Sequence, residues 1–268
     1  MKATEGDPGL DSQLSFSEVE KNQGWFLSCK STPAGDLVIG GEETFDTVIT
    51  AIEELTPSIV KVLINTPSDF TWTAGQFIAL TRPDGLSRFY SIASVHSEGI
   101  IELHIRIFPD GQMSQWLIKE GSNSNVTIGA PQGNCCYDPE NAEDTLILAG
   151  TGTGLAPLVG IVKDCLEKQH DKPIHLFHGA RSQSSFYFSD ELKALADSNS
   201  NFHYHEVIGE EGSTPEEVLY EEIKDIEEFQ SAAAFLCGNT DLVNKLRKKL
   251  FLSGMSMKKI KVDAFAPA

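Results

Sequence analysis

The chain has 268 residues, which is too long for one small domain. Of these residues 40% are hydrophobic and 9% aromatic, which is enough for packed cores. Its formal net charge of −18 excludes nucleic acid as an expected partner, because binding phosphates needs clustered Lys and Arg. The sequence has no apolar run long enough to cross a membrane and begins without the features of a secretion signal. We therefore expect a cytoplasmic protein without membrane insertion.

The first half of the chain predicts an N-terminal segment followed by short strands. Residues 1–13 are rich in Gly, Asp and Ser and predict a flexible tail, and residues 14–42 predict an arm. Strand-like runs follow at 47–52, 58–66, 76–82, 88–94, 100–108 and 125–131, with one helix near 113–119. Residues 43–138 therefore predict an antiparallel β-barrel.

After residue 138 the pattern changes to an alternation of strands and helices. Strands are expected at 144–150, 174–180, 202–208, 232–238 and 258–265, and helices at 156–169, 189–197, from 215 and at 240–253. Thr214 and Glu217 form a capping box before the third helix, and Gly254 ends the fourth. Residues 139–268 thus predict an α/β domain with a parallel sheet, whose ligands bind beyond the carboxyl ends of the strands.

Two short stretches carry residue types that a plain strand or turn does not need. Residues 88–94 read Arg-Phe-Tyr-Ser-Ile-Ala-Ser, which places a cation, a phenol and hydroxyls on a strand. Residues 150–157 read Gly-Thr-Gly-Thr-Gly-Leu-Ala-Pro, between a buried strand and a helix. Such glycines let the backbone approach an anion at a helix N-terminus, although an ordinary tight turn is the alternative.

These stretches resemble motifs of the ferredoxin–NADP reductase family. Residues 88–94 resemble its R-x-Y-S-x-x-S flavin motif, and 150–157 resemble its G-T-G-x-x-P nucleotide turn. Residues 236–239, Leu-Cys-Gly-Asn, resemble its C-G motif, and 263–265, Asp-Ala-Phe, match its acidic and aromatic ending. The resemblance covers about residues 45–268. It implies an FAD-dependent NAD(P)H oxidoreductase that takes a hydride onto FAD and passes electrons to a protein or small-molecule acceptor.

The resemblance also implies which residues bind FAD. Arg88 would pair with the cofactor pyrophosphate, Tyr90 would lie against the isoalloxazine ring, and Ser91 would offer its hydroxyl to the reactive N5 edge. The further residues of the implied FAD site are Phe89, His104, Ile105, Arg106, Gly111, Gln112, Met113 and Ser114.

The nicotinamide nucleotide would occupy the second domain. The turn residues implied to receive its phosphates are Gly152, Thr153, Gly154 and Pro157. Cys237, Gly238 and Asn239 would lie near the nicotinamide, and Phe265 would cover the flavin. Ser91, Cys237 and Phe265 are thus the candidate catalytic residues, although Cys237 and Phe265 also fit ordinary packing positions. Arg181 is a candidate contact for a 2′-phosphate, but relatives that use NADH carry the same Gly-Ala-Arg, so NADH is slightly favoured.

The arm at 14–42 resembles the end of a plant-type ferredoxin domain. It contains only Cys29, whereas an iron–sulfur cluster needs four ligands, so we expect a remnant that binds no cluster and packs on the barrel. The five cysteines show no metal-binding spacing and predict mainly small buried residues. His203 and His205 alone are a weak metal signal, and no metal site is expected.

Charge is unevenly distributed in the second domain. Residues 206–228 carry ten acidic residues and one Lys, and 245–261 carry seven basic residues. These runs predict either solvated helix surfaces or a docking face for a protein partner. Two alternatives to a free-standing reductase therefore stay open. One is an electron-transfer subunit of a larger complex that docks through 206–228, and the other is a non-catalytic flavin-binding regulatory module.

Overall fold

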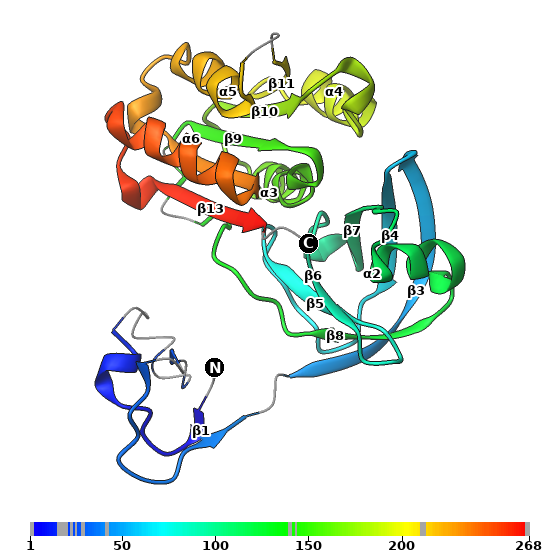
Figure 1. Ribbon diagram of the computed structural model, residues 1–268. Coiled ribbons are helices and arrows are strands. Elements are labelled where there is room, and N and C mark those ends of the chain that lie inside the picture. Colours follow the sequence, from blue (N-terminus) through cyan, green and yellow to red (C-terminus); the bar gives the residue numbers. More distant parts are fainter. Residues whose placement is uncertain are drawn as a thin grey trace. The chain divides into compact units, whose positions relative to one another are not determined.

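The computed structural model describes residues 3–14, 21, 24, 26–27, 30–40, 43–138, 141–142, 144–209 and 213–265. Its contacts divide the chain into two units, Met1–Thr44 and Phe45–Ala268. The larger unit holds two sheets, one in the barrel half, which is blue to green in Figure 1, and one in the half that follows, which is green to red. The second is called the nucleotide half after the expectation from the sequence. The four-part division expected from the sequence stays a prediction.

The N-terminal unit contains the short strands β1 (Ala3–Glu5) and β2 (Val38–Ile39), which pair antiparallel, and the 3₁₀ turn η1 (Leu10–Ser12). The Ser12 hydroxyl donates to the carbonyl of Gly9 at 2.6 Å, and the backbone N–H of Leu27 donates to the Ser12 carbonyl at 2.9 Å. Residues 3–13, expected as a loose tail, therefore make hydrogen bonds with the rest of this unit. Cys29 lies outside the described residues.

The first half of the larger unit is a six-stranded antiparallel sheet in the order β6-β5-β8-β3-β4-β7. Its strands are β3 (Thr44–Thr56), β4 (Ile59–Asn65), β5 (Phe77–Thr81), β6 (Ser87–Ser91), β7 (Ile100–Arg106) and β8 (Asn125–Gly129). A bridge between Ile92 and Leu103 joins the two edges of the sheet, which closes it into the expected barrel. The interior is apolar because alternate side chains of each strand face inward, as Ile101, Leu103 and Ile105 do on β7.

One helix follows β7, as expected. The helix α2 (Gln112–Trp116) continues directly into the π-helical turn η4 (Leu117–Gly121). Met113 and Leu117 are buried and pack into the barrel core. The 3₁₀ turn η3 (His96–Glu98) connects β6 to β7.

The second half is a five-stranded parallel sheet in the order β11-β10-β9-β12-β13. Its strands are β9 (Leu146–Thr151), β10 (Ile174–Ala180), β11 (Phe202–Ile208), β12 (Ala233–Asn239) and β13 (Ile260–Phe265). The chain runs outward from β9 in one direction through β10 and β11, and then in the other through β12 and β13. The strand order therefore reverses beside β9, and parallel sheets bind ligands at such a switch point.

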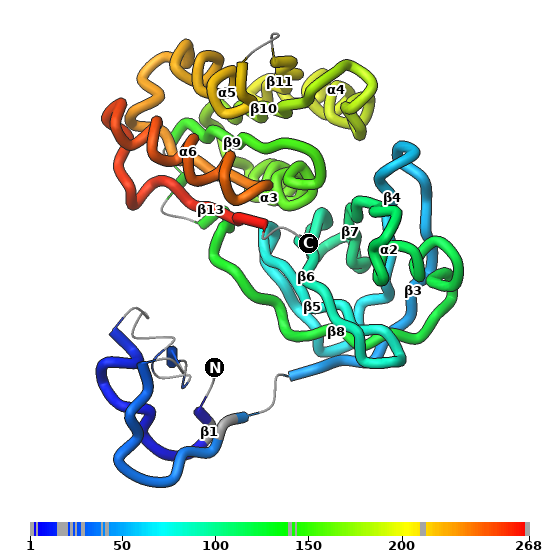
Figure 2. Tube along the Cα trace, viewed as in Figure 1, coloured from blue at the N-terminus to red at the C-terminus, as the bar shows by residue number. Residues whose placement is uncertain are grey.

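Helices cover both faces of this sheet. The helices α3 (Leu155–Glu167) and α4 (Ser189–Ser198) pack on one face, and α5 (Pro215–Lys224) and α6 (Thr240–Leu252) pack on the other, as the tube in Figure 2 also shows. The 3₁₀ turns of this half are η6 (Gly152–Gly154), η7 (Gln183–Ser185), η8 (Phe229–Ser231) and η9 (Met257–Lys259). None of the helices within the described ranges combines the length and the apolar character that crossing a membrane needs.

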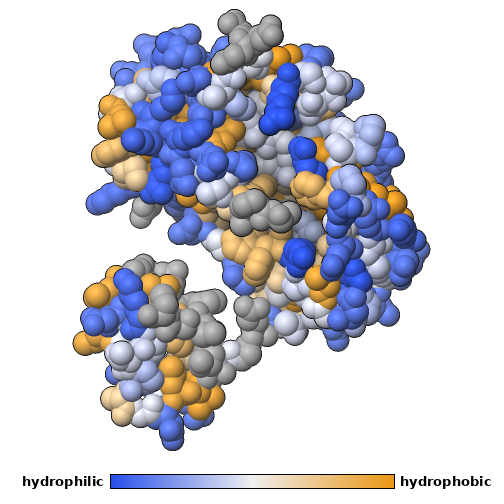
Figure 3. Space-filling view, in the orientation of Figure 1, coloured by the Kyte–Doolittle hydropathy of each residue, from blue (hydrophilic) through white to orange (hydrophobic). Residues whose placement is uncertain are grey.

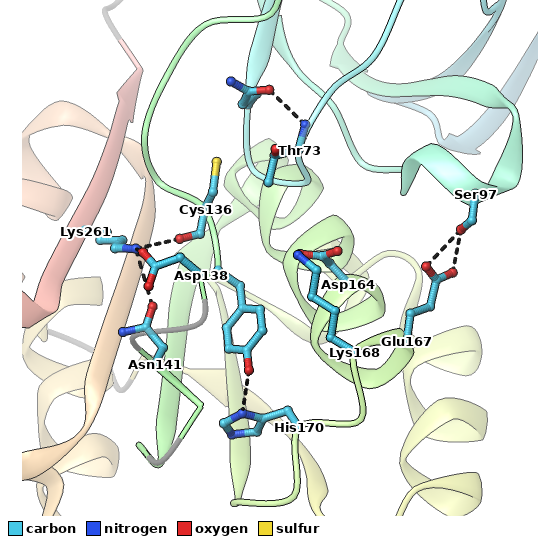
Figure 4. A network of polar contacts seen from close by, with 12 residues as sticks. Thr73, Ser97, Cys136, Asp138, Asn141, Asp164, Glu167, Lys168, His170 and Lys261 are labelled. Carbon is cyan, nitrogen blue, oxygen red and sulfur yellow. Dashed lines mark hydrogen bonds and ion pairs between the residues drawn. The ribbon is translucent and has the colours of Figure 1, made fainter. Parts of the chain in front are cut away.

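The barrel half packs against the α3 face of the parallel sheet. Ile59, Cys135 and Tyr137 join the core cluster that contains the buried side chains of α3. Polar contacts reinforce this junction in Figure 4, where Lys261 of β13 donates to the Cys136 carbonyl at 2.8 Å and Ser97 of η3 donates to Glu167 of α3 at 2.7 Å. The helix α5, which carries four of the ten acidic residues of the run 206–228, thus covers the sheet face away from the barrel.

Candidate functional site

Two glycine-containing turns meet at the switch point of the parallel sheet. Gly150 and Gly154 flank the end of β9, and a Cβ on either would lie 2.7 Å or 2.4 Å from the carbonyl oxygen of Cys237, at the end of β12. Real Cβ atoms do not approach a carbonyl so closely, so the two turns pack backbone to backbone. Gly152 adopts a φ of +54°, which favours glycine. The turn therefore presents bare backbone at the start of α3.

The barrel contributes a hydroxyl to the same place. Ser91, the last residue of β6, donates a hydrogen bond of 2.7 Å to the carboxyl oxygen Oδ2 of Asp263 on β13. Asp263 pairs in register with Cys237 on the neighbouring strand. Burial raises the pKa of the Asp263 carboxyl, whereas the hydrogen bond from Ser91 opposes that rise. Ser91 and Asp263 thus form a bonded pair that joins the two halves beside the glycine turns.

Cys237 is buried next to a second cysteine. Its Sγ lies 3.8 Å from Sγ of Cys135, which belongs to the segment after the barrel. Burial raises the pKa of the Cys237 thiol well above its usual value, and the neighbouring Cys135 raises it further. A neutral thiol of this kind packs as a small apolar group, which agrees with the expectation of mainly buried cysteines.

The edge strand β6 displays the cation and the aromatic groups of the flavin motif. Arg88 is exposed, and Phe89 is 61% exposed although its ring meets Phe77 edge to face. Tyr90 is half-buried, and burial raises its pKa to about 12 while the charge of Arg88 opposes the rise. A flat apolar ring with an anionic tail would find complementary groups along this strand. The residues present therefore fit FAD.

On the neighbouring strand β7, unlike on β6, the predicted site residues Ile105 and His104 are buried. Ile105 points into the barrel core, so only its backbone can face a cofactor. His104 is buried, with Nε2 2.7 Å from Oε1 of Glu102 and Nδ1 3.2 Å from the hydroxyl oxygen of Tyr187. Both ring nitrogens are engaged, so the side chain holds the barrel against the nucleotide half. Burial would raise the pKa of Glu102, but the hydrogen bond to His104 lowers it.

In the turn at the start of α2, the Ser114 hydroxyl also forms its hydrogen bonds within the protein. The Ser114 Oγ accepts a hydrogen bond from the Phe108 N–H at 3.1 Å and donates to the Gly111 carbonyl at 3.2 Å. A Cβ on Gly111 would lie 2.5 Å from this oxygen, so glycine leaves room for it. Met113 is buried in the core, and the Gln112 carbonyl accepts from Arg82 at 3.0 Å. The backbone of this turn, rather than the Ser114 hydroxyl, is what remains for contacting a phosphate.

The remaining predicted residues lie at the carboxyl ends of the parallel strands. Asn239 caps α6, since its Oδ1 accepts a hydrogen bond of 2.9 Å from the Asp241 N–H, so its side chain has a structural partner. Phe265 is half-buried at the end of β13, where its carbonyl accepts from Thr240 at 2.7 Å. Gly238 has a φ of +131°, and Pro157 is buried in the first turn of α3.

Arg181 lines a pocket of about 390 Å³ at the ends of β10 and β11. The other lining residues are Gly179, Ala180, Val207, Gly209, Ser213, Thr214, Pro215 and Val218. Beside Arg181, the Ser182 hydroxyl lies 2.9 Å from that of Ser185. A pocket of this size is suited to one end of a dinucleotide whose phosphates reach the turn after β9.

Sequence reasoning missed three residues that build the junction: Asp263, Cys135 and Tyr187. The Asp-Ala-Phe motif contained Asp263, so that residue could have been added from the resemblance alone. Cys135 and Tyr187 follow no local pattern. Their contacts with Cys237 and His104 join residues 102 and 83 positions apart, which no window of sequence reveals.

The two halves match two different family models. Residues 46–137 match the oxidoreductase FAD-binding domain, and residues 148–248 match the oxidoreductase NAD-binding domain. The chain is 26% identical to the reductase subunit of an aromatic O-demethylase from Amycolatopsis sp., over 98% of this chain and 85% of that protein. It is also 29% identical to the ferredoxin–NAD(P)(+) reductase component of naphthalene 1,2-dioxygenase/salicylate 5-hydroxylase systems from Ralstonia sp., over 91% of this chain and 79% of that protein.

A solved structure shares the fold over nearly the whole chain. The crystal structure of the Amycolatopsis cytochrome P450 reductase GcoB superposes with a TM-score of 0.75 at 24% identity, and covers 99% of this chain and 86% of that one. The barrel followed by a parallel sheet is therefore the shared architecture, as the sequence predicted.

Proposed function

We propose that the chain, an FAD-dependent NAD(P)H oxidoreductase, belongs to the ferredoxin–NADP reductase family and is the reductase component of an oxygenase system. It takes electrons from a nicotinamide nucleotide onto FAD and passes them to an oxygenase component or to an iron–sulfur protein that serves one. The relatives that match nearly the full chain support this role, since their names describe reductase parts of such systems.

One observation carries the proposal most directly. The Ser91–Asp263 pair lies where the barrel strand with the flavin motif meets the glycine turns of the nucleotide half. FAD supplies the hydride-accepting chemistry when it is bound. The protein would orient two rings face to face and keep water out, and the junction has buried walls for that purpose.

We assign roles to the residues around this junction. Arg88 binds the anionic tail of FAD, and Tyr90 packs against its ring. When FAD is bound, the Ser91 hydroxyl turns its single proton away from Asp263 and donates a hydrogen bond to the reactive ring edge. Cys237 fills the space beside the nicotinamide as a neutral thiol, and Phe265 covers the flavin face until the nicotinamide displaces it. The backbone of residues 111–114 contacts the second phosphate of FAD.

The nucleotide binds with its phosphates at the turn 152–154 and its adenosine in the pocket beside Arg181. We propose NADH as the preferred donor, since Arg181 is the only charged residue among the described residues that line this pocket. A 2′-phosphate carries nearly two negative charges, and one exposed arginine neutralises them poorly. Comparing kcat/KM for NADH and NADPH tests this choice, and a clear preference for NADPH would contradict it.

The acceptor docks away from the acidic run at 206–228. Four of its ten acidic residues lie on α5, on the sheet face opposite the barrel, whereas an electron acceptor must approach the flavin. Part of its charge is also balanced within the fold, because Glu216 pairs with Lys245 of α6 at 2.9 Å. Mostly hydrophilic residues cover the α5 and α6 surface in Figure 3, which is typical of a solvated face.

We also propose that residues 14–42 bind no iron–sulfur cluster. Cys29 is the only cysteine before Cys135, and Cys135 is buried beside Cys237 in the larger unit. Iron and acid-labile sulfide measured in the purified protein should both be far below one atom per chain, and stoichiometric amounts would contradict the proposal. A cytoplasmic location stays a prediction from the sequence.

The reductase role is tested with artificial acceptors first. Protein reconstituted with FAD should oxidise NADH in the presence of ferricyanide, and the rate should fall to background when FAD is removed. The oxygenase component of the same system should then accept electrons from the protein in place of ferricyanide. Failure to oxidise either nucleotide with any acceptor would contradict the proposal.

A further inference from the structure

Two cysteine side chains meet inside the junction between the barrel half and the nucleotide half. The Sγ atom of Cys135 lies 3.8 Å from that of Cys237, so the two thiols are in direct contact. Cys237 belongs to the Cys-Gly motif, whereas Cys135 belongs to no motif, and the proposed function gives Cys135 no role. The cysteines in the described part of the chain are all free thiols: Cys135, Cys136, Cys165 and Cys237.

Close backbone packing holds the two cysteines face to face. Cys237 lies near the end of β12, and its carbonyl packs against Gly150 and Gly154, where an added Cβ would lie 2.7 Å and 2.4 Å from the carbonyl oxygen. Cys135 lies between β8 and β9, and its carbonyl packs against Gly75, where a Cβ would lie 2.1 Å from the oxygen. The contact between the sulfurs is therefore fixed from both sides. A disulfide bond of about 2.05 Å needs the sulfurs to approach by less than about 2 Å.

The pair lies beside the site assigned to hydride transfer. Cys237 is in register with Asp263, whose carboxyl accepts the hydrogen bond from Ser91. The exposed fractions of Cys237 and Cys135 are 0% and 2%, so only a small oxidant can reach them, when the packing opens locally. Burial also raises the pKa of the Cys237 thiol well above its usual value, and the thiolate is the reactive form. Oxidation of the pair should therefore be slow and should need prolonged exposure.

We propose that Cys135 and Cys237 form a dithiol that hydrogen peroxide oxidises to an intramolecular disulfide, and that this disulfide stops hydride transfer at the junction. One sulfur attacks the peroxide, whose O–O bond breaks, and a sulfenic acid and one water form. The other sulfur then attacks the sulfenic sulfur, so that the S–S bond forms and a second water leaves. The dithiol loses two electrons and two protons, and the peroxide becomes two water molecules.

The effect on hydride transfer rests on the proposed function. Reduced flavin gives hydrogen peroxide with O₂ when no acceptor takes its electrons, so the oxidant would arise at this junction. The disulfide draws the Cys237 sulfur away from the space beside the nicotinamide. Because the Cys237 carbonyl packs on Gly150 and Gly154, any movement of its backbone also displaces the turn that receives the nucleotide phosphates.

The test measures the bond and its effect separately. The FAD-loaded protein is incubated with hydrogen peroxide, freed of the excess with catalase, and then alkylated and digested. Mass spectrometry should find the peptide of Cys135 joined to that of Cys237, and the intact chain should be lighter by two hydrogen atoms. Anaerobic flavin reduction by NADH should be about 10-fold slower or more than before treatment, since misplacement on the order of 1 Å can cost about 100-fold in rate. Dithiothreitol should restore the rate.

The variant Cys135→Ser removes one sulfur and leaves Cys237 in place. After the same treatment it should form no disulfide and should keep most of its own untreated rate. The matched controls Cys136→Ser and Cys165→Ala each remove another described cysteine and should be inactivated as the unmodified protein is. Thermal melting of each variant confirms that it is folded.

Three outcomes would overturn the inference. They are the absence of a peptide that joins Cys135 to Cys237, a disulfide that leaves the rate of flavin reduction unchanged, and equal inactivation of Cys135→Ser. A failure of the proposed function looks different, because the untreated protein would then bind no FAD or would not be reduced by NADH. Mass spectrometry would still show in that case whether the disulfide forms.

Discussion

At the scale of single residues, the functional junction depends on a few contacts between distant parts of the chain. Ser91 and Asp263 are 172 positions apart, yet their side chains are bonded at 2.7 Å. The sequence motifs indicated each side of this junction but not the bond itself. Hydrogen bonding at such a site orients groups for transfer, so losing one donor affects rate more than stability.

Ser91→Ala removes the hydroxyl but retains the strand and its apolar neighbours. We expect flavin reduction by NADH to slow about 10-fold or more, because one oriented hydrogen-bond donor near developing charge stabilises the transition state by about 1 to a few kcal/mol. FAD content should be nearly unchanged. Stopped-flow reduction measures the rate, with Ser87→Ala on the same strand as the control. Unchanged reduction kinetics would count against the role assigned to Ser91.

Gly154→Ala tests the backbone packing of the two turns. Its added Cβ would lie 2.4 Å from the Cys237 carbonyl oxygen, so the turns must separate. Overpacking of this kind costs about 1–3 kcal/mol in the free energy of unfolding and should also weaken nucleotide binding. Gly35→Ala is the matched control, since a Cβ there meets nothing within 4 Å. Urea unfolding of the two variants should differ, and equal midpoints would contradict the close packing.

At the scale of elements, local sequence patterns were enough to predict most strands and helices. Alternation over 100–108 and the continuous apolar run in 144–150 predicted β7 and β9, because each pattern matches one way of burying a strand. The capping box at Thr214 and Glu217 is confirmed at the start of α5. What the sequence could not supply was the set of contacts among elements, such as His104 against Tyr187, because side-chain partners on separate strands and loops leave no periodic trace.

The capping box offers a prediction for one helix. The Thr214 hydroxyl and N–H both donate to Glu217 Oε2, at 2.9 Å and 3.0 Å. Thr214→Ala removes the cap and should lower the free energy of unfolding by about 1 kcal/mol, without altering FAD content. Chemical denaturation measures the change, and Thr214→Ser should recover most of it. Equal stability of all three proteins would show that α5 does not depend on its cap.

At the scale of the whole molecule, the two halves of the larger unit form one packed body with the candidate site at their junction. Core residues of the barrel segment pack with α3, and polar contacts from β13, η3 and β7 cross the same boundary. A flavin held on one half can therefore meet a nucleotide held on the other without a large rearrangement. This arrangement accounts for the position of the candidate site.

Buried histidines predict how the stability of the molecule depends on pH. Burial lowers the pKa of His178 and of His175 to about 4, from an ordinary value near 6.5, and neighbouring His203 and His205 add to the effect at His175. A depressed pKa means that the unfolded chain binds protons first as the pH falls. Stability should therefore be full above pH 6.5 and decrease down to about pH 4.

Each such imidazole changes the free energy of unfolding by up to about 1.4 kcal/mol per pH unit within this window. The raised pKa of Asp263 acts in the opposite sense but at the acidic end of the range. Urea unfolding at several pH values measures the slope, and His178→Gln should reduce it. A slope that the substitution leaves unchanged would place the titrating groups elsewhere.

The central claim is that a flavin on the barrel accepts a hydride from a nucleotide bound at the turn 152–154. The most direct measurement is the absorption spectrum of the purified, FAD-loaded protein before and after anaerobic addition of NADH. We predict a yellow flavin spectrum that bleaches rapidly, within seconds. A flavin spectrum that persists with both NADH and NADPH would contradict reductase activity and favour a non-catalytic flavin module, and failure to retain any flavin would contradict the assignment of residues 88–94.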